Sequence, residues 1–486
     1  MSYKIAVIGS GIGGIASAIR MAVRGHEVHV FEQNRYPGGK LSEVRLGAYR
    51  FDAGPSLFTM PELVEELFQL AGEAVKDTFQ FIRLEEVCRY FYEDGTRLTA
   101  FADQEKLVRE LAGTGEDPDR IRKALARNET LYDFLGEMFM FRSLHDPRTY
   151  FTKSAMRSYR NLHKLDFFRT MAQANEAQFK DPRLEQMFNR YATYNGSDPY
   201  QTPATMNIIA HLEYGKGAFF PRGGMHQITT SLVGLAERCG VTFHYDASVQ
   251  EILTRGKQIS GIRVGNDQLE FDRVISNMDV VGTYKRLLPD VKAPGKLLTQ
   301  PKSSSALIFY WGIKAAFPQM DLHNIFFSQD YKKEFRHIFQ SGDIGPDPTV
   351  YINITSKYNQ GDAPEGCENW FTMINVPNNS GQDWDRLIGE ARGRILDKLS
   401  RMLDQPIEPL VEEESLLEPR TIESKTSSSQ GALYGNSSNN KFAAFLRHNN
   451  VSKKVKGLFF CGGSVHPGGG IPMALSSAKI VDRYFE

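Results

Sequence analysis

A glycine-rich turn lies near the start of the chain, between two segments of regular pattern. Residues 3–8 form a short apolar run with β-branched side chains, which predicts a buried strand. Residues 9–14 follow as Gly-Ser-Gly-Ile-Gly-Gly, a match to G-x-G-x-x-G, and apolar positions at helical spacing come next. A second extended run then ends on Glu32, about 20 residues after the glycines. This order of strand, glycine turn, helix, strand and acid predicts a dinucleotide-binding site.

Each residue of this motif has a mechanical role in such a site. Gly9 permits the tight turn, Gly11 lets a pyrophosphate approach the backbone, and Gly14 lets helix and strand pack closely. The helix directs its free N–H groups and the positive end of its dipole toward that phosphate. Glu32 lies where an acid would bond a ribose hydroxyl and repel a 2′-phosphate. The alternative is an ordinary glycine-rich turn, and the surrounding pattern favours the nucleotide site.

The composition excludes several other classes of protein. Lys+Arg and Asp+Glu both total 58, so the formal net charge is zero and no nucleic-acid partner is expected. The four cysteines are scattered without a C-x-x-C, which suits a reducing cytoplasm better than a disulfide framework, and no metal site is predicted. The first strand begins almost at Met1, so no signal peptide is expected. No run of about 18 apolar residues occurs, so no membrane-spanning segment is expected.

Two further turns follow the first motif. Residues 33–40 place Arg35 before Gly38 and Gly39, and a guanidinium with glycine backbone N–H groups can surround a second phosphate. Residues 51–56, Phe-Asp-Ala-Gly-Pro-Ser, form another tight turn. Taken alone, each of these could equally be a surface turn.

The last part of the chain carries a second strong motif. Residues 457–473 read as a strand, a glycine-dense loop and Pro472 near the first position of a helix. This pattern predicts a second helix N-terminus directed at an anionic group. His466 lies in the loop, and we interpret it as a structural histidine rather than a catalyst.

These motifs, in this order, resemble the flavin amine oxidase and phytoene desaturase superfamily. The turn Phe-Pro-Arg-Gly-Gly-Met at residues 220–225 and His-Pro-Gly-Gly-Gly-Ile-Pro at residues 466–472 are similar to the bacterial carotenoid desaturase branch. The resemblance spans nearly the whole chain and implies FAD as the cofactor rather than NAD. It also implies a strand near Val249 that contacts adenine and a loop at residues 431–435 near the flavin. The implied FAD-binding residues are Gly9, Gly11, Gly13, Gly14, Glu32, Gln33, Arg35, Gly38, Gly39, Lys40, Gly54, Pro55, Ser56, Val249, Gly462, Gly463, Gly470, Ile471 and Pro472.

The expected fold is α/β, with a Rossmann-like FAD-binding domain of the GR2-type flavoproteins, a β-sheet substrate domain and a helical cap. We expect a discontinuous FAD-binding domain at residues 1–70, 216–290 and 440–486. The expected substrate-binding domain comprises residues 71–108, 200–215 and 291–439, and the cap residues 109–199.

The cap contains a segment that combines positive charge with aromatic side chains. Such a segment can lie on an anionic membrane surface, which would make the protein a peripheral one on the inner, cytoplasmic face of the membrane. The alternative is a solvated helical face over a local core. Only Asp146 and Asp166 oppose seven basic residues: Arg142, Arg148, Lys153, Arg157, Arg160, Lys164 and Arg169.

The resemblance implies an FAD-dependent carotenoid desaturase, which removes a hydride and then a proton from a long apolar polyene held in a narrow tunnel. No Ser-His-Asp or paired-carboxylate set stands out, so no catalytic acid or base is assigned. The electron acceptor, oxygen or a quinone, stays open. The alternatives are a phytoene desaturase proper, a carotenoid or retinol saturase-like enzyme, an amine-oxidase-like flavoenzyme and a non-catalytic prenyl-binding module.

Within the family, residues 213–221 resemble the hydroxycarotenoid 3,4-desaturase subgroup more than phytoene desaturases proper. This resemblance implies 3,4-desaturation of a late carotenoid that is already hydroxylated or monocyclic. Polar groups at one end of the tunnel could then fix the position of the substrate. Tyr214, Lys216 and Tyr434 are candidates for such groups, and structural roles are equally open to them.

Overall fold

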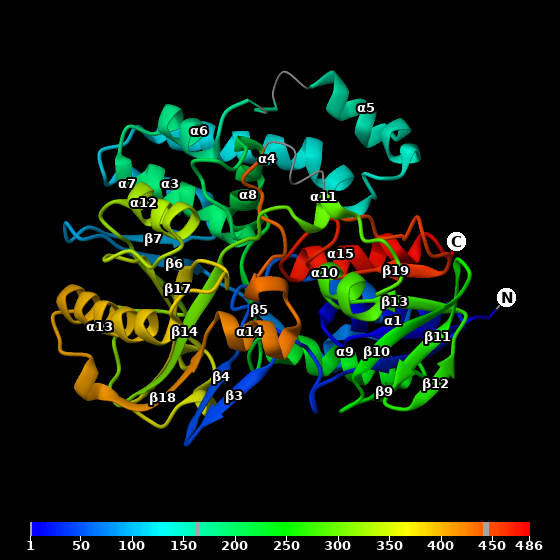
Figure 1. Cartoon of the computed structure of the whole chain (residues 1–486). Helices are drawn as coiled ribbons and strands as arrows, with labels where there is room; N and C mark the ends of the chain where they lie inside the picture. Colours follow the sequence, from blue (N-terminus) through cyan, green and yellow to red (C-terminus); the bar gives the residue numbers. More distant parts are fainter. Residues whose placement is uncertain (1, 162–164, 167, 441–446) are drawn as a thin grey trace.

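The computed structural model describes residues 2–161, 165–166, 168–440 and 447–486. Two β-sheets lie side by side, and a layer of helices extends along one side of the molecule (Figure 1). Both chain termini lie beside the smaller of the two sheets (Figure 1).

The first sheet has five parallel strands in the order β19-β13-β1-β2-β9. Helices α1, α2, α9 and α15 cover one face, and Ile5, Ile15, Ile19 and Leu475 are part of the core that joins them to the sheet. A three-stranded antiparallel sheet of β10, β11 and β12 adjoins it. The expected Rossmann-like architecture is therefore confirmed. The elements are β1 Lys4–Ile8, α1 Ile12–Val23, β2 Glu27–Phe31, α2 Glu62–Leu70, α9 His226–Arg238, β9 Thr242–His244, β10 Val249–Arg255, β11 Gln258–Val264, β12 Asp267–Glu270, β13 Arg273–Ser276, β19 Leu458–Phe460 and α15 Ile471–Asp482.

The second sheet has seven strands in the order β18-β14-β17-β16-β15-β6-β7. All neighbouring pairs are antiparallel except β15 and β6. Helix α13 packs on one face through a core that includes Trp311, Trp370 and Trp384. The elements are β6 Glu86–Phe91, β7 Arg97–Phe101, β14 Ser305–Ile313, β15 His323–Phe326, β16 Val350–Ile354, β17 Glu368–Val376, α13 Trp384–Met402 and β18 Val411–Leu417.

Strand β14 shows why one sheet face is available for a ligand. All nine of its residues are buried, and successive side chains point to opposite faces of the sheet. Leu307 and Trp311 point to the core under α13, whereas Ile308 and Tyr310 point to the opposite face. That opposite face borders the cavity described below.

Helices α4, α5, α6 and α7 lie in the layer above the two sheets (Figure 1). Helix α4 is the longest of the described part of the chain, and the side chain of Asp117 caps its first turn. No helix within the described ranges is both long and apolar enough to cross a membrane. The remaining helices are α3 Gln104–Ala112, α4 Pro118–Phe141, α5 Lys153–Arg160, α6 Met171–Gln178, α7 Pro182–Asn189, α8 Ile208–Tyr214, α10 Val280–Gly282, α11 Gly295–Leu298, α12 Tyr331–Arg336 and α14 Pro419–Thr426.

Two further antiparallel pairs of strands complete the fold: the hairpin of β3 (Glu43–Leu46) with β4 (Tyr49–Asp52), and the pairing of β5 (Phe81–Arg83) with β8 (Phe219–Pro221), which are far apart in the sequence. The sequence pattern predicted a turn over residues 51–56, and its first two residues are wrong, because Phe51 and Asp52 belong to β4 and pair with β3. Asp52 instead accepts hydrogen bonds from the backbone N–H groups of Met225 and His226, at 2.8 and 3.0 Å, and so fixes the start of α9.

Candidate functional site

A single cavity of about 760 Å³ extends from the glycine turns to the free face of the seven-stranded sheet. Most of the predicted FAD-binding residues border it, although they come from opposite ends of the chain. The predicted residues that line it are Gly9, Gly11, Gly13, Glu32, Gln33, Gly38, Gly39, Lys40, Gly54, Pro55, Ser56, Val249, Gly462, Gly463, Gly470, Ile471 and Pro472.

The turn after β1 requires glycines, because the side chain of Asn277 packs directly against it. A Cβ atom on Gly11 would lie 2.6 Å from Nδ2 of Asn277, and one on Gly13 would lie 2.9 Å from its Oδ1. Gly11 is also the N-cap of α1, and no side chain caps that helix. The backbone N–H groups at this helix start are therefore directed toward the cavity, as an anionic group requires.

Glu32 is held in one orientation by four hydrogen bonds. Oε2 accepts from the backbone N–H and the hydroxyl of Ser10, at 2.9 and 2.8 Å. Oε1 accepts from the backbone N–H and the side-chain amide of Asn34, at 2.9 and 2.8 Å. The carboxylate is buried and lines the cavity, so it is preorganised to accept from the hydroxyls of a ribose.

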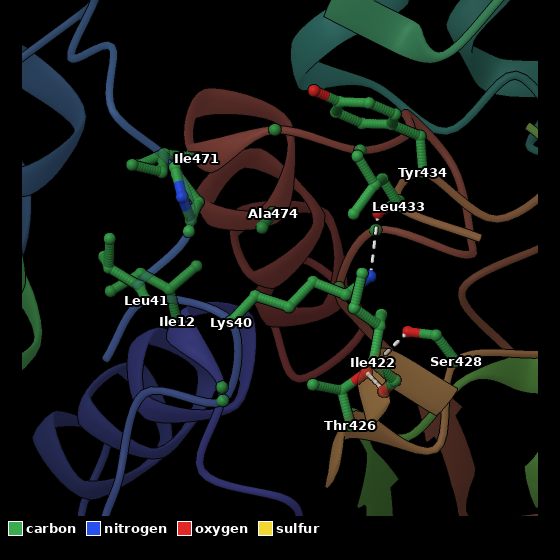
Figure 2. Close-up of a pocket in the computed structure, with 18 of the residues that line it drawn as sticks. Ile12, Lys40, Leu41, Ile422, Thr426, Ser428, Leu433, Tyr434, Ile471 and Ala474 are labelled. Atoms are coloured by element: carbon green, nitrogen blue, oxygen red, sulfur yellow. Dashed lines mark hydrogen bonds between the residues drawn. The ribbon is translucent and has the colours of Figure 1, made fainter. Parts of the chain in front are cut away.

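Lys40 is a buried cation that joins two loops at the cavity. Its Nζ donates to the backbone carbonyls of Leu433 and Ala432, at 2.8 and 3.3 Å, and Figure 2 shows the side chain extending to the loop beside Tyr434. Burial lowers the pKa of Lys40 to about 8, which the charge of Asp279 opposes in part. The lysine therefore titrates close to neutral pH.

The C-terminal motif forms the opposite wall of the cavity. Helix α15 begins at Ile471, after Gly470 with a φ of +96°, and Pro472 occupies its first turn. Arg447 stabilises the loops in front of this helix by donating to the carbonyls of Tyr434 and Gly463, at 2.8 and 3.3 Å. The structural interpretation of His466 agrees with its contact, since its Nε2 lies 2.8 Å from the Arg142 carbonyl and the residue is buried.

Two of the predicted FAD-binding residues lie outside the cavity lining. Gly14 lies behind the turn, where a Cβ would be 2.2 Å from the Gly9 carbonyl, so it serves the packing of helix against strand. The side chain of Arg35 is 88% exposed and pairs with Asp246 at 3.5 Å. The guanidinium of Arg35 is thus in solvent and outside the cavity lining in this structure, and its contact with a phosphate stays a prediction.

The sequence pattern did not identify Asn277 and Arg447 as site residues, although both line the cavity. Asn277 packs against Gly9, Gly11, Gly13 and Gly462, so it supports both glycine loops. It lies in the Ser-Asn-Met-Asp segment at residues 276–279, directly after strand β13 of the same sheet.

The part of the cavity next to the seven-stranded sheet is mostly apolar. Carboxylates also line the cavity at Glu32, Glu43, Glu213 and Asp279, and each has a hydrogen-bond partner. No cluster of metal ligands occurs among the residues described. The apolar lining residues on this side are Val87, Met206, Ile208, Ile209, Leu212, Ile308, Tyr310, Ile325, Phe371 and Met373.

The three polar residues suggested for substrate positioning have different placements. Tyr214 is buried outside the cavity lining, with its hydroxyl 3.1 Å from that of Tyr90. Lys216 also lies outside the lining, with its Nζ 4.9 Å from the centre of the Tyr132 ring. Tyr434 does line the cavity, and burial raises its pKa to about 12.

Comparisons with known proteins agree with this geometry. Residues 12–481 match the family model described as flavin containing amine oxidoreductase. A 1-hydroxycarotenoid 3,4-desaturase from a Flavobacterium species is 49% identical over 478 residues, which is 98% of each chain. A 4,4′-diaponeurosporene oxygenase from Staphylococcus aureus is 32% identical over 503 residues, covering 99% of this chain and 98% of that protein.

Solved structures share the fold at low sequence identity. An oxidoreductase from Methanosarcina mazei matches with a TM-score of 0.63 at 16% identity, covering 98% of each chain. Putrescine oxidase bound to putrescine matches with a TM-score of 0.63 at 14% identity, covering 100% of this chain and 99% of that one. The overall architecture is therefore that of these proteins.

Proposed function

The chain belongs to the family of flavin-containing amine oxidoreductases, and we propose that within it the protein is an FAD-dependent carotenoid 3,4-desaturase. The proposed substrate is a late carotenoid that already carries a hydroxyl at the end to be desaturated. The relative at 49% identity over 98% of both chains carries this proposal, since its name specifies that reaction.

The residues at the glycine turns fit FAD. Gly11 and Gly13 leave the backbone bare where a pyrophosphate would lie, and Glu32 presents a carboxylate where a ribose would lie. When bound, FAD supplies the two-electron acceptance that removal of two hydrogens from a C–C single bond requires. We assign residues 1–70, 216–290 and 440–486 to the domain that binds it.

The apolar part of the cavity supports a polyene substrate. A long hydrocarbon offers nothing to hydrogen-bond along its middle, so binding has to come from shape and from burial of apolar surface. Ile308, Phe371 and Met373 on the sheet face and Leu212 on α8 provide such a lining. Because every described carboxylate at the cavity already has a hydrogen-bond partner, we assign these walls to binding and orientation rather than to proton transfer.

Incubation of the purified protein with a 1-hydroxylated carotenoid tests the proposal. The expected product has lost two hydrogens and absorbs further to the red, because the conjugated system is longer. Phytoene should stay unchanged in the same assay, and its conversion to coloured products would instead indicate a phytoene desaturase.

Oxygen insertion is the second candidate activity, because the relative at 32% identity is named an oxygenase. Mass spectrometry of the product separates the two reactions, since desaturation lowers the mass by two hydrogens and oxygen insertion raises it by one oxygen. A product with added oxygen would overturn the desaturase proposal.

We also propose that the protein binds the cytoplasmic face of the membrane peripherally, where long carotenoids dissolve. Helix α5 and its flanks expose large apolar side chains beside basic ones: Phe151 and Phe168 are each 84% exposed and Met156 is 49% exposed. Lys153 and Arg160 on α5 add positive charge. Lys164, which the sequence pattern included in this segment, lies outside the described residues. Such a surface suits an anionic bilayer.

Flotation with anionic vesicles tests membrane binding. Reversal of charge at Lys153 and Arg160 should weaken binding, and so should added salt, because attraction between surface charges is screened. A Lys333→Glu variant on α12 reverses charge elsewhere on the surface and serves as the control. Binding that is insensitive to both treatments would assign the α5 segment to a solvated face.

A further inference from the structure

Polar side chains gather in and behind the cavity wall where β6, β15 and β16 of the seven-stranded sheet face the short helix Arg190–Asn195. Most of them belong to a closed network. Arg190 donates to Glu213 Oε1 at 2.8 Å and to the Tyr90 hydroxyl at 2.6 Å. Tyr191 and Tyr194 donate to the two oxygens of Glu213, at 2.9 and 2.6 Å. These groups use their hydrogen-bonding capacity on one another, so they shape the wall and leave no strong site for a ligand.

His323 in β15 differs from this network because one of its ring nitrogens has no hydrogen-bond partner among the residues described. The residue is 4% exposed and lines the cavity. Its Nδ1 lies 2.8 Å from the Tyr351 hydroxyl and 3.3 Å from the side-chain amide nitrogen of Asn353. Its Nε2 is buried and has no hydrogen-bond partner among the residues described. A buried polar atom without a partner is costly, and a ligand in the cavity can supply that partner.

The neighbours of His323 determine which nitrogen carries the proton. The amide nitrogen of Asn353 also donates to the Leu322 carbonyl at 3.0 Å, so this atom is the NH₂ group and not the oxygen. An N–H on Nδ1 would face that NH₂ group, so Nδ1 is the acceptor. Burial, helped by the charge of Arg190, lowers the pKa of His323 to about 3, so the ring is neutral and Nε2 carries the hydrogen.

A relay of hydroxyl groups connects this donor to the FAD-binding turn. The hydroxyl of Ser56, directly after Gly54 and Pro55, lies 2.7 Å from the Tyr351 hydroxyl, which in turn donates to His323 Nδ1. The relay fixes the His323 ring, and with it the unpartnered Nε2, relative to the turn at Gly54, Pro55 and Ser56. All three of these side chains line the same cavity.

The proposed reaction places its hydroxyl near the same point. In a 1-hydroxylated, 3,4-desaturated chain the hydroxyl-bearing carbon is two bonds from the nearer reacting carbon, roughly 2.5 Å away for C–C bonds of about 1.5 Å. A group that recognises this hydroxyl must therefore lie close to the flavin and not at the far end of the tunnel. His323 is a candidate for this group because the Tyr351 hydroxyl links its ring to Ser56, which belongs to the predicted FAD-binding turn.

We propose that His323 is the specificity-determining residue and that its Nε2 donates a hydrogen bond to the terminal hydroxyl of the substrate. This inference rests on the proposed function. A neutral donor of this kind binds a hydroxyl or carbonyl oxygen without requiring a charge on the ligand. A hydrocarbon end of the same shape would leave the buried N–H without a partner, so the site discriminates against it. Tyr351 and Ser56 act as positioning residues for the ring.

Two substitutions separate the roles of the two ring nitrogens. His323→Asn places an amide near the position of Nδ1 and removes the donor at Nε2, whereas His323→Gln reaches the Nε2 position with an N–H group. His337→Asn, in the helical segment after α12 and outside the cavity lining, is the matched control. For each holoprotein, kcat/KM and Kd are measured with a 1-hydroxylated carotenoid and with the same polyene lacking the hydroxyl.

The wild type should prefer the hydroxylated substrate by about 10-fold to 100-fold, as expected for a buried donor that one substrate leaves unpaired. His323→Asn should abolish most of this preference, while His323→Gln and His337→Asn should retain it, at unchanged flavin content. If the His323→Asn protein converts the carotenoids and keeps the full preference for the hydroxylated one, the role of His323 is overturned and the proposed function stands. Asn195 lines the same cavity. If Asn195→Leu abolishes the preference for the hydroxylated substrate and His323→Asn does not, the role of His323 is also overturned. Failure of the wild type to convert either carotenoid would overturn the proposed function as well.

Discussion

The two parts of the cavity are built in different ways. Around the glycine turns the wall is largely backbone, and the side chains that matter, Glu32 and Asn277, support the loops. Along the seven-stranded sheet the wall consists of side chains from several strands, such as Ile308, Phe371 and Tyr351. A backbone site tolerates almost no added volume, whereas a side-chain site can change its shape by substitution. The first part is therefore suited to one constant cofactor and the second to discrimination among substrates.

The largest effect is expected at the backbone part. Gly11→Val should abolish FAD binding, because its Cβ would lie 2.6 Å from Asn277 Nδ2 and would displace the side chain that supports the glycine turns. Flavin absorbance of the purified protein is the measurement, with circular dichroism to verify folding. Gly389→Ala on α13 is the control, since a Cβ there meets nothing within 4 Å. A folded Gly11→Val protein with full flavin content would show that the cofactor lies elsewhere.

A substitution in the side-chain part should separate substrate binding from cofactor binding. Leu212→Trp adds volume to the apolar lining and should lower kcat/KM for the carotenoid by roughly 100-fold while the flavin content stays the same. Product chromatography and flavin absorbance on one preparation measure both effects. Loss of flavin together with activity would mean that the two parts are not independent.

Glu32 tests whether the FAD-binding part depends on a carboxylate as well as on bare backbone. Glu32→Gln keeps the size of the side chain but removes the charge and replaces one acceptor with a donor that faces Ser10 or Asn34. FAD affinity should fall by about 10-fold, the typical cost of one impaired buried hydrogen bond. Titration of the flavin-free protein with FAD gives the value, and an unchanged Kd would exclude a ribose contact.

The smallest expected effect is a pH dependence at Lys40. Burial depresses its pKa to about 8, so the side chain loses its proton as the pH rises through that value. FAD is anionic and binds the protonated form better, so its affinity should fall by about threefold to tenfold between about pH 7 and pH 9. The Lys40→Met protein should bind FAD more weakly at the lower pH and lack this step. A step of equal size in both proteins would assign the titration to another group.

The FAD-binding part could be predicted from the sequence because its residues act locally. Gly9, Gly11 and Glu32 lie within one β-α-β segment, where spacing determines position. Spacing alone does not fix the position of the Arg35 guanidinium, because the direction of a long exposed side chain depends on a distant partner, Asp246. Strand β14 is likewise apparent in the sequence, because the apolar run within residues 305–313 is long and bounded.

The substrate part could not be predicted in this way. His323 is a candidate for substrate recognition only because of the tertiary structure. Strand β15 pairs with β16, which places Tyr351 beside His323, and Ser56 contacts the same Tyr351 hydroxyl. Neither β15 nor β18 was expected, since β15 is only four residues long and the residues of β18 are alternately half-buried and exposed. Arg447 likewise acquires its role from loops that the sequence does not show to be adjacent.

The continuity of the cavity has a consequence for the order of assembly. The glycine turns and the sheet face border one space, so whatever occupies the first becomes a boundary surface of the second. Without the nucleotide, the cavity continues past the position of the flavin. A polyene that enters it then has no boundary that fixes its position. Binding of the cofactor thus sets the length of the substrate cavity, so it has to precede productive binding of a carotenoid.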